Sequence, residues 1–124
     1  MRPHEAWLEK SLHDLKSARI LAESADTVLD TAVYHTQQSA EKALKVFLAF
    51  NNQPIVKTHD LTALNELCVK LDDSFTNLRL GRGLKPIAIE FRYPGECMDP
   101  GLDEAGEAII NAEKIYLFIK EKIT

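Results

Sequence analysis

The sequence predicts an all-α protein, an up-and-down antiparallel bundle of four long helices with a shorter, broken helix at about residues 75–92. Apolar residues recur at intervals of three or four along four long segments, which is the spacing of one helix face. No segment alternates apolar and polar residues as a half-buried strand would. Clusters of Pro, Gly and Asn, which end helices, fall between these segments, as at residues 51–54 and 93–101. A length of 124 residues fits a single domain over residues 1–124.

The first helix is predicted at about residues 4–25. Pro3 suits a position at or just before its first turn, where a missing N–H has no helical partner to lose. Trp7 is expected to pack at the open end of the bundle. The expected buried stripe of this helix consists of Leu8, Leu12, Leu15, Ala18, Leu21 and Ala22.

The second helix follows a short turn, so we expect it to lie antiparallel beside the first. The side-chain oxygen of Thr27 or Asp30 is expected to cap its start. The helix is expected to end near Phe50, because Pro54 cannot continue it and the intervening Asn residues tolerate left-handed backbone.

The third helix is predicted to begin with Thr58 as its N-cap. Asp60 would then lie in the first turn, where the helix dipole favours an anion. Cys68 falls in the apolar stripe and is expected to fill the core as a small hydrophobe, not to act as a reactive thiol. The whole stripe consists of Leu61, Leu64, Leu67, Cys68 and Leu71.

The broken helix comes next. Residues 72–74 are expected to cap a fresh turn of helix. Two glycines and a proline then interrupt the pattern, and a continuous helix through them would lose about 4–5 kcal/mol relative to alanine. We therefore predict a break near residues 81–85 and a second helical piece at about residues 86–92. Residues 93–101, with two Pro-Gly steps, are expected to form a loop.

The last helix is predicted to start at Leu102 or Asp103. Acidic residues lie at its beginning and lysines at its end, which is the distribution that the helix dipole favours. Its expected buried stripe consists of Ala105, Ile109, Ala112, Tyr116, Ile119 and Ile123.

Composition limits the partners and the compartment. The formal net charge is −4, so the chain as a whole is not an electrostatic nucleic-acid binder, and such a role would need a local basic patch. The longest apolar runs are a few residues, so no membrane span is expected. The N-terminal residues show no apolar signal core, and Cys68 and Cys97 lack a CxxC spacing. A cytoplasmic protein with free thiols is expected.

The polar face of the second helix is the richest in chemistry. Glu41 precedes Lys45 by four residues, the better orientation for an intrahelical ion pair. A second polar group, including His59, lies at the start of the third helix, where backbone N–H groups can hold an anion. If the bundle brings these groups together with the end of the broken helix, they form a site for phosphate and a base. The candidate residues are His35, Gln38, Lys42, Lys45, His59, Arg92 and Tyr93. The same polar face is equally typical of a solvated helix surface.

Three motifs, in this order along the chain, resemble those of a known protein family: HTQQSAEKALK at residues 35–45, THDL at 58–61 and RYP at 92–94. Together they make the chain similar to the HEPN domain family, over nearly its whole length. The resemblance implies a prokaryotic helical bundle that is often a homodimer. It also implies a separately encoded minimal nucleotidyltransferase as partner, in a toxin–antitoxin-like pair, and a role in nucleotide or substrate binding.

Many members of that family cleave RNA without a metal, using an Arg followed after four to six residues by a His. Arg92 is followed by residues 93–99 without a His, and no other Arg has one at that spacing. Since His is the side chain that exchanges protons near neutral pH, the catalytic assignment does not transfer. We expect no catalytic residue, no metal site and no cofactor.

The leading hypothesis is a non-catalytic module that binds a nucleotide or RNA and presents it to a nucleotidyltransferase. The first alternative is an RNase with a non-standard site of Arg92, Glu96 and either His35 or His59. The second is a dimerisation bundle without a ligand, in which the polar face of the second helix is an interface.

Overall fold

The computed structural model describes residues 2–78 and 100–124, which form an all-α bundle without strands in these two ranges. The helices are α1 (Pro3–Glu23), α2 (Leu29–Phe50), α3 (Leu61–Leu71), the 3₁₀ helix η1 (Asp73–Asn77) and α5 (Leu102–Lys122). The predicted fold class is confirmed. No helix in the described part of the chain is long and apolar enough to cross a membrane.

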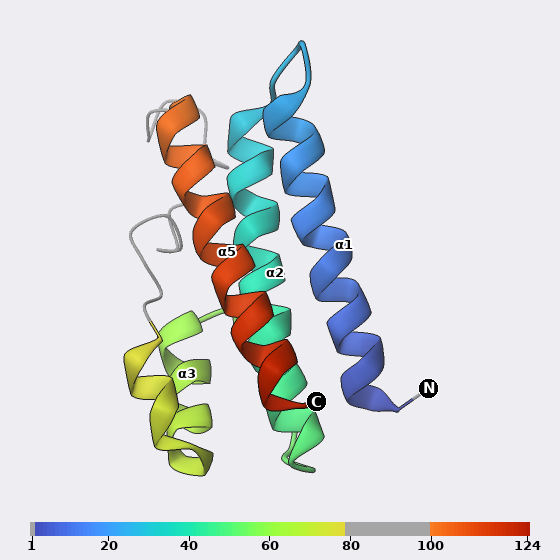
Figure 1. Ribbon diagram of the computed structural model, residues 1–124, viewed down its shortest axis with the longest axis vertical. Coiled ribbons are helices and arrows are strands. Elements are labelled where there is room, and N and C mark those ends of the chain that lie inside the picture. The colour runs from blue at the N-terminus through green and yellow to red at the C-terminus, as the bar shows by residue number, and fades with distance from the viewer. Residues whose placement is uncertain (1, 79–99) are drawn as a thin grey trace.

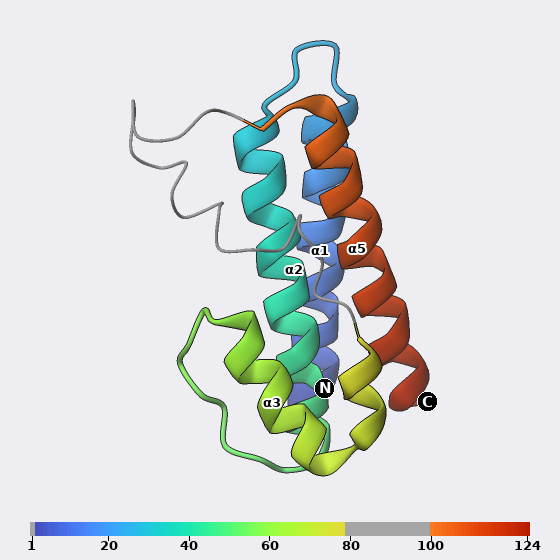
Figure 2. The same cartoon turned by 90° about the vertical axis from the view of Figure 1, so that its left-hand side faces the viewer.

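Helix α2 lies at the centre of the bundle. Helices α1 and α5 run along it, and α3 packs beside the half that ends at Phe50 (Figures 1 and 2). Phe47 and Phe75 lie with ring centroids 4.5 Å apart, and Phe118 of α5 meets Phe75 edge to face at 5.0 Å. Full burial of a side chain such as Phe75 contributes about 2–3 kcal/mol. This aromatic group joins three elements into one core.

Cys68 confirms the expectation of a core-filling residue. It is fully buried, and its Sγ lies 3.7 Å from the carbonyl oxygen of Leu44 on α2. Burial raises the pKa of the thiol to about 12, because the thiolate would lose its hydration. The thiol is therefore protonated at neutral pH and unreactive while the protein is folded.

Two predicted helix starts are wrong. The N-cap of α3 is Asp60, whose Oδ1 accepts hydrogen bonds from the backbone N–H groups of Thr62 and Ala63 at 3.0 and 3.3 Å. Thr58 lies one step earlier, where its hydroxyl accepts from the Asp60 N–H at 3.1 Å. Thr58 and Asp60 are both good capping residues, and in the structure the Asp60 carboxylate is the group that caps α3.

The N-cap of α2 is Val28, which has no capping side chain. Asp30, one of the two expected caps, lies inside the first turn, and its Oδ1 accepts from the Thr31 N–H at 2.8 Å. The predicted end of this helix at Phe50 is confirmed. Asn52 follows with a φ of 57°, the left-handed conformation that Asn tolerates.

The first part of the predicted broken helix is η1, capped by Asp72 through hydrogen bonds from the backbone N–H and the hydroxyl of Ser74. The predicted break at residues 81–85, the helical piece at 86–92 and most of the loop at 93–101 lie outside the described residues. The last helix starts at Leu102 as predicted. The N–H of Gly101 donates to Glu104 at 3.1 Å, which fixes that start.

The buried stripe of α1 differs from the predicted one. Leu8, Leu12 and Leu21 are only partly buried, whereas the buried positions of this helix are Ser11, Asp14, Leu15 and Ala18. These four residues also follow helical spacing, but two of them are polar. The buried side of α1 is therefore rotated about the helix axis from the predicted one. This rotation brings Asp14 into contact with α2.

Candidate functional site

A pair of serines holds α1 and α2 close together. The Ser11 hydroxyl donates to the carbonyl oxygen of Ser39, and the Ser39 hydroxyl donates to that of Ser11, both at 2.8 Å. Small side chains at a helix contact let the two backbones approach, and the reciprocal bonds satisfy both buried hydroxyls. This contact fixes which polar side chains of α1 face α2.

The first charged cluster is centred on Asp14 of α1. Its Oδ1 lies 2.8 Å from His35 Nδ1, and its Oδ2 lies 2.5 Å from Lys42 Nζ. The two partners are seven residues apart on α2, which is two helical turns, so they lie on one face. Because an ionised carboxylate only accepts hydrogen bonds, His35 donates from Nδ1 and its Nε2 is left for another partner.

The second cluster is centred on Glu41 of α2, whose side chain is 3% exposed. Its Oε1 lies 2.8 Å from Nδ1 of His59, in the segment before α3. Its Oε2 accepts from Lys45 Nζ at 3.4 Å, so the predicted intrahelical ion pair is present. A carboxylate so far from water is costly unless it is paired, and these two contacts compensate it.

The two clusters have the same composition: one carboxylate, one lysine and one histidine. The polar face of α2 is therefore not the solvated surface that its sequence equally allowed, because Glu41 and Lys45 are buried and His35 and Lys42 are partly buried. Each lysine has a counter-charge already in place. Since an ammonium group has three donors and Asp14 takes one from Lys42, this lysine can still bind a further acceptor.

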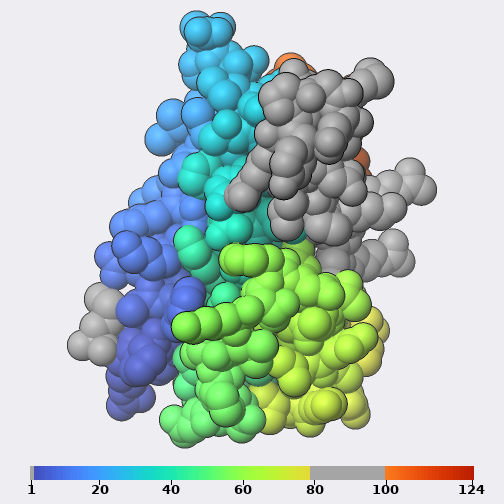
Figure 3. Space-filling model, turned by 180° about the vertical axis from the view of Figure 1, so that it is seen from behind, coloured from blue at the N-terminus to red at the C-terminus, as the bar shows by residue number. Residues whose placement is uncertain are grey.

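An open groove lies next to the Asp14 cluster, with a volume of about 460 Å³. It is lined by Ala6, Trp7 and Lys10 from α1 and by Lys42 from α2. The Trp7 ring also receives Lys45, whose Nζ is 5.4 Å from the ring centroid, a cation–π contact. Figure 3 shows the face of the molecule on which α1 and α2 lie side by side, with α3 below.

The structure brings four of the seven predicted site residues into the two clusters: His35, Lys42, Lys45 and His59. Gln38 is partly buried on α2, one turn from His35 and Lys42. Arg92 and Tyr93 lie outside the described residues. No group of three His, Cys, Asp or Glu side chains within the described ranges is placed to hold a metal ion.

Four residues of this site were not among the predicted ones: Asp14, Glu41, Trp7 and Lys10. A signal for Asp14 existed, because it shares a helical stripe with Ser11, Leu15 and Ala18, and a carboxylate in such a stripe needs a buried partner. Trp7 was expected only as a packing residue. It does pack against the core, but it also lines the groove.

Comparison with known proteins agrees with this architecture. The crystal structure of an archaeal HEPN homologue superposes with a TM-score of 0.66 and 23% sequence identity, covering all of both chains. At that identity the likeness shows the fold. No curated protein matches the chain. The family model of the HEPN domain matches residues 4–123, which is almost the whole sequence and includes both charged clusters. The chain belongs to the HEPN domain family.

Proposed function

We propose that this protein is a non-catalytic HEPN module that binds a nucleotide or a short RNA in the groove between α1 and α2. The observation that carries the proposal is the lining of that groove, in which one aromatic ring lies beside two lysines. A base can stack on an indole face, and such stacking contributes about 1–3 kcal/mol per base. Phosphate oxygens are the natural acceptors for the ammonium groups.

The two lysines differ in what they offer. Lys10 is exposed and forms no ion pair with any residue of the described ranges. Lys42 is held by Asp14, which restricts its side chain before a ligand arrives and so reduces the entropy lost on binding. We therefore assign Lys42 to positioning one phosphate and Lys10 to attracting it.

Tryptophan fluorescence tests the groove directly, because Trp7 is the single tryptophan of the chain. Titration with ATP, and separately with a short oligoribonucleotide, is expected to change the Trp7 emission with a saturable profile. Lys10→Gln should weaken the affinity about tenfold, the loss of about 1.4 kcal/mol from one charged contact. Lys16→Gln is the matched control, since Lys16 is an exposed lysine of the same helix that does not line the groove.

Emission that stays constant up to millimolar ligand, with calorimetry showing no heat of binding, would contradict the groove assignment. Equal weakening by Lys10→Gln and Lys16→Gln would reduce the effect to general electrostatic attraction.

We further propose that the module acts with a separately encoded minimal nucleotidyltransferase, in a toxin–antitoxin-like pair. The support is membership of the HEPN family together with the absence of the Arg–His motif that its RNA-cleaving members use. Affinity purification of the tagged protein from its native cells, with mass spectrometry of bound proteins, should recover such an enzyme. Recovery of the chain with itself alone would favour a self-contained dimer.

One observation favours a second function, RNA cleavage. Glu41 holds Nδ1 of His59, whose side chain is 71% exposed, which leaves Nε2 as the ring nitrogen that could exchange a proton with a substrate. Incubation of RNA with the purified protein, with and without its partner, decides between the two functions. Intact RNA after hours would exclude cleavage, whereas cleavage that is lost in His59→Ala would replace the binding-only proposal.

A further inference from the structure

A second pocket lies between the end of α2, helix α3 and the segment of residues 51–60 that joins them. Figure 2 shows this segment arching outward from the end of α2 and returning to the start of α3. The pocket has a volume of about 240 Å³ and is lined by Leu48, Gln53, Pro54, Val56, Leu67, Lys70 and Leu71. None of these residues lines the Trp7 groove, so the two sites are separate.

The lining of this pocket is mainly apolar. Leu48 of α2 is 2% exposed and belongs to the core, whereas Val56 and Leu71 are 41% and 40% exposed. Leu67 and Leu71 are four residues apart on α3, so they line the pocket from one face of that helix. Leu71 was part of the predicted buried stripe of α3, and its exposure is used by the pocket. Apolar side chains that gather around a concave site are typical of a ligand pocket.

Two polar side chains complete the lining, Gln53 and Lys70. Lys70 is exposed and forms no ion pair with any residue that the structure describes. Glu66 lies four residues before it on α3, the favourable spacing for an intrahelical pair, yet the two are not paired. An ammonium group that is unpaired within the described ranges, beside apolar side chains, suits an anion that carries a hydrocarbon group.

We propose that this pocket binds a small monocarboxylic acid. Its hydrocarbon part lies against Leu48, Leu67 and Leu71, and its carboxylate accepts a hydrogen bond from Lys70. The volume is below the range of about 300–1,000 Å³ that is usual for drug-sized ligands, so an acid of about six carbons fits. A nucleotide does not match this pocket, because one ammonium group among apolar side chains would leave most of its polar atoms unpaired.

NMR titration of the isotope-labelled chain tests the charge and the location together. The probes are hexanoate, hexanol and hexylamine, which is protonated at neutral pH. Hexanoate should bind most tightly and hexylammonium least, with saturable shifts of the backbone amide signals of Val56, Leu67 and Leu71. Butanoate should bind about tenfold more weakly than hexanoate, because two fewer methylene groups are buried.

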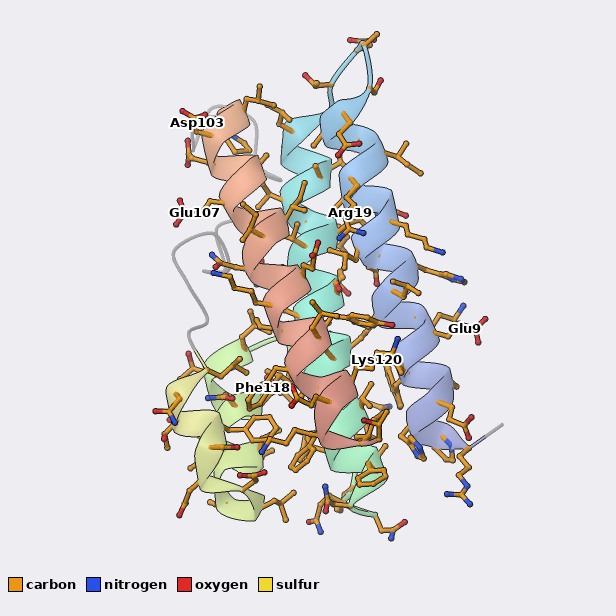
Figure 4. All side chains as sticks on the ribbon, in the orientation of Figure 1. Glu9, Arg19, Asp103, Glu107, Phe118 and Lys120 are labelled. Carbon is orange, nitrogen blue, oxygen red and sulfur yellow. The ribbon has the colours of Figure 1, made fainter. Side chains whose placement is uncertain are left out.

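Lys70→Glu reverses the charge at the pocket and should reverse the order of the probes. Hexanoate should bind at least about fivefold more weakly, and hexylammonium should become the tightest ligand. Lys120→Glu is the matched control, since Lys70 and Lys120 are both exposed lysines in the last turn of a helix. In Figure 4, Lys120 projects from α5 on the side opposite Phe118, which packs on η1. This control should leave all three affinities unchanged, and circular dichroism verifies that both variants keep their helices.

Three results would overturn the proposal. Equal affinities for hexanoate and hexanol, or the wild-type order in Lys70→Glu, would show that the pocket does not select a carboxylate and takes an apolar group alone. No saturable shift with any probe would reject the site itself. Trp7 emission should stay constant when hexanoate is added, because Trp7 lies in the other groove. The carboxylate site and the nucleotide groove can therefore fail independently.

Discussion

Asp14 and Glu41 have side chains that are only 12% and 3% exposed, and each accepts hydrogen bonds from one lysine and one histidine. Desolvation of a carboxylate is costly, so such groups persist in a helix interface only when their partners are held in place. The same contacts orient the imidazole rings and restrict the lysines. At the scale of the residue, the stability of the bundle and the geometry of the candidate site therefore depend on the same two side chains.

Asp14→Asn tests this dependence. The amide keeps the size of the side chain but loses the charge that holds Lys42, so we expect a loss of about 2 kcal/mol in the free energy of unfolding. Urea denaturation followed by circular dichroism measures it. Glu9→Gln, an exposed acid on the same helix, should change the stability by less than about 0.5 kcal/mol. Equal effects of the two variants would show that the Asp14 contacts contribute nothing specific.

At the scale of the element, the starts of α1, α3 and α5 each have a particular polar contact. The Glu5 carboxylate accepts from the N–H of Arg2 at 3.2 Å, and Glu104 does the same for Gly101 at 3.1 Å. Helix α3 instead has a carboxylate at the N-cap itself. Because α3 follows directly after His59, the Asp60 cap also fixes the backbone that presents His59 to Glu41.

Alanine substitutions at Asp60 and Thr58 distinguish the observed N-cap of α3 from the one that the sequence predicted. Asp60→Ala removes the acceptor of two backbone N–H groups and should destabilise the protein by about 1 kcal/mol. Thr58→Ala removes only the acceptor for the Asp60 N–H in the preceding turn and should cost less. Thermal or urea unfolding of both variants provides the comparison. A larger loss in Thr58→Ala would contradict the assignment of the cap.

At the scale of the whole molecule, ion pairs connect α5 to elements distant in sequence. Arg19 of α1 pairs with Glu113 near the middle of α5. At the end of α5, Lys122 Nζ lies 2.9 Å from Asp72, the residue that caps η1. The Ser74 hydroxyl, followed by Lys122, lowers the pKa of Asp72 from 3.8 to about 2, because both stabilise the ionised carboxylate.

This lowered pKa gives the sign of a pH effect. Because the folded pKa lies below the unfolded one, the contribution of Asp72 to stability is complete above about pH 3.8 and is lost as the pH falls toward 2. Carbon-detected NMR titration of the Asp72 carboxyl should show the low midpoint in the folded protein. Ser74→Ala should raise that midpoint toward 3.8, whereas Thr76→Ala, in the same turn, should not. An unchanged midpoint in Ser74→Ala would reject the assigned cause.

Several features of the fold were predictable because they depend on neighbouring residues. The end of α2, the start of α5 and the burial of Cys68 follow from periodicity, helix-breaking residues and side-chain size. The N-cap of α3 was not resolved by these rules, since Thr58 and Asp60 both satisfy them. In the candidate site, the pairing of Glu41 with Lys45 was predictable because four residues of helix fix their separation.

The sequence alone determined the all-α class, the long helices and the polar face of α2, since backbone hydrogen bonds and side-chain periodicity within a helix are local. Only the tertiary structure decided that Asp14 lies between His35 and Lys42, which are 21 and 28 residues away. Such a contact depends on the rotation and separation of two helices, and these are set by packing across the interface, as at Ser11 and Ser39. The groove beside Trp7 also depends on tertiary packing, because residues of both α1 and α2 line it.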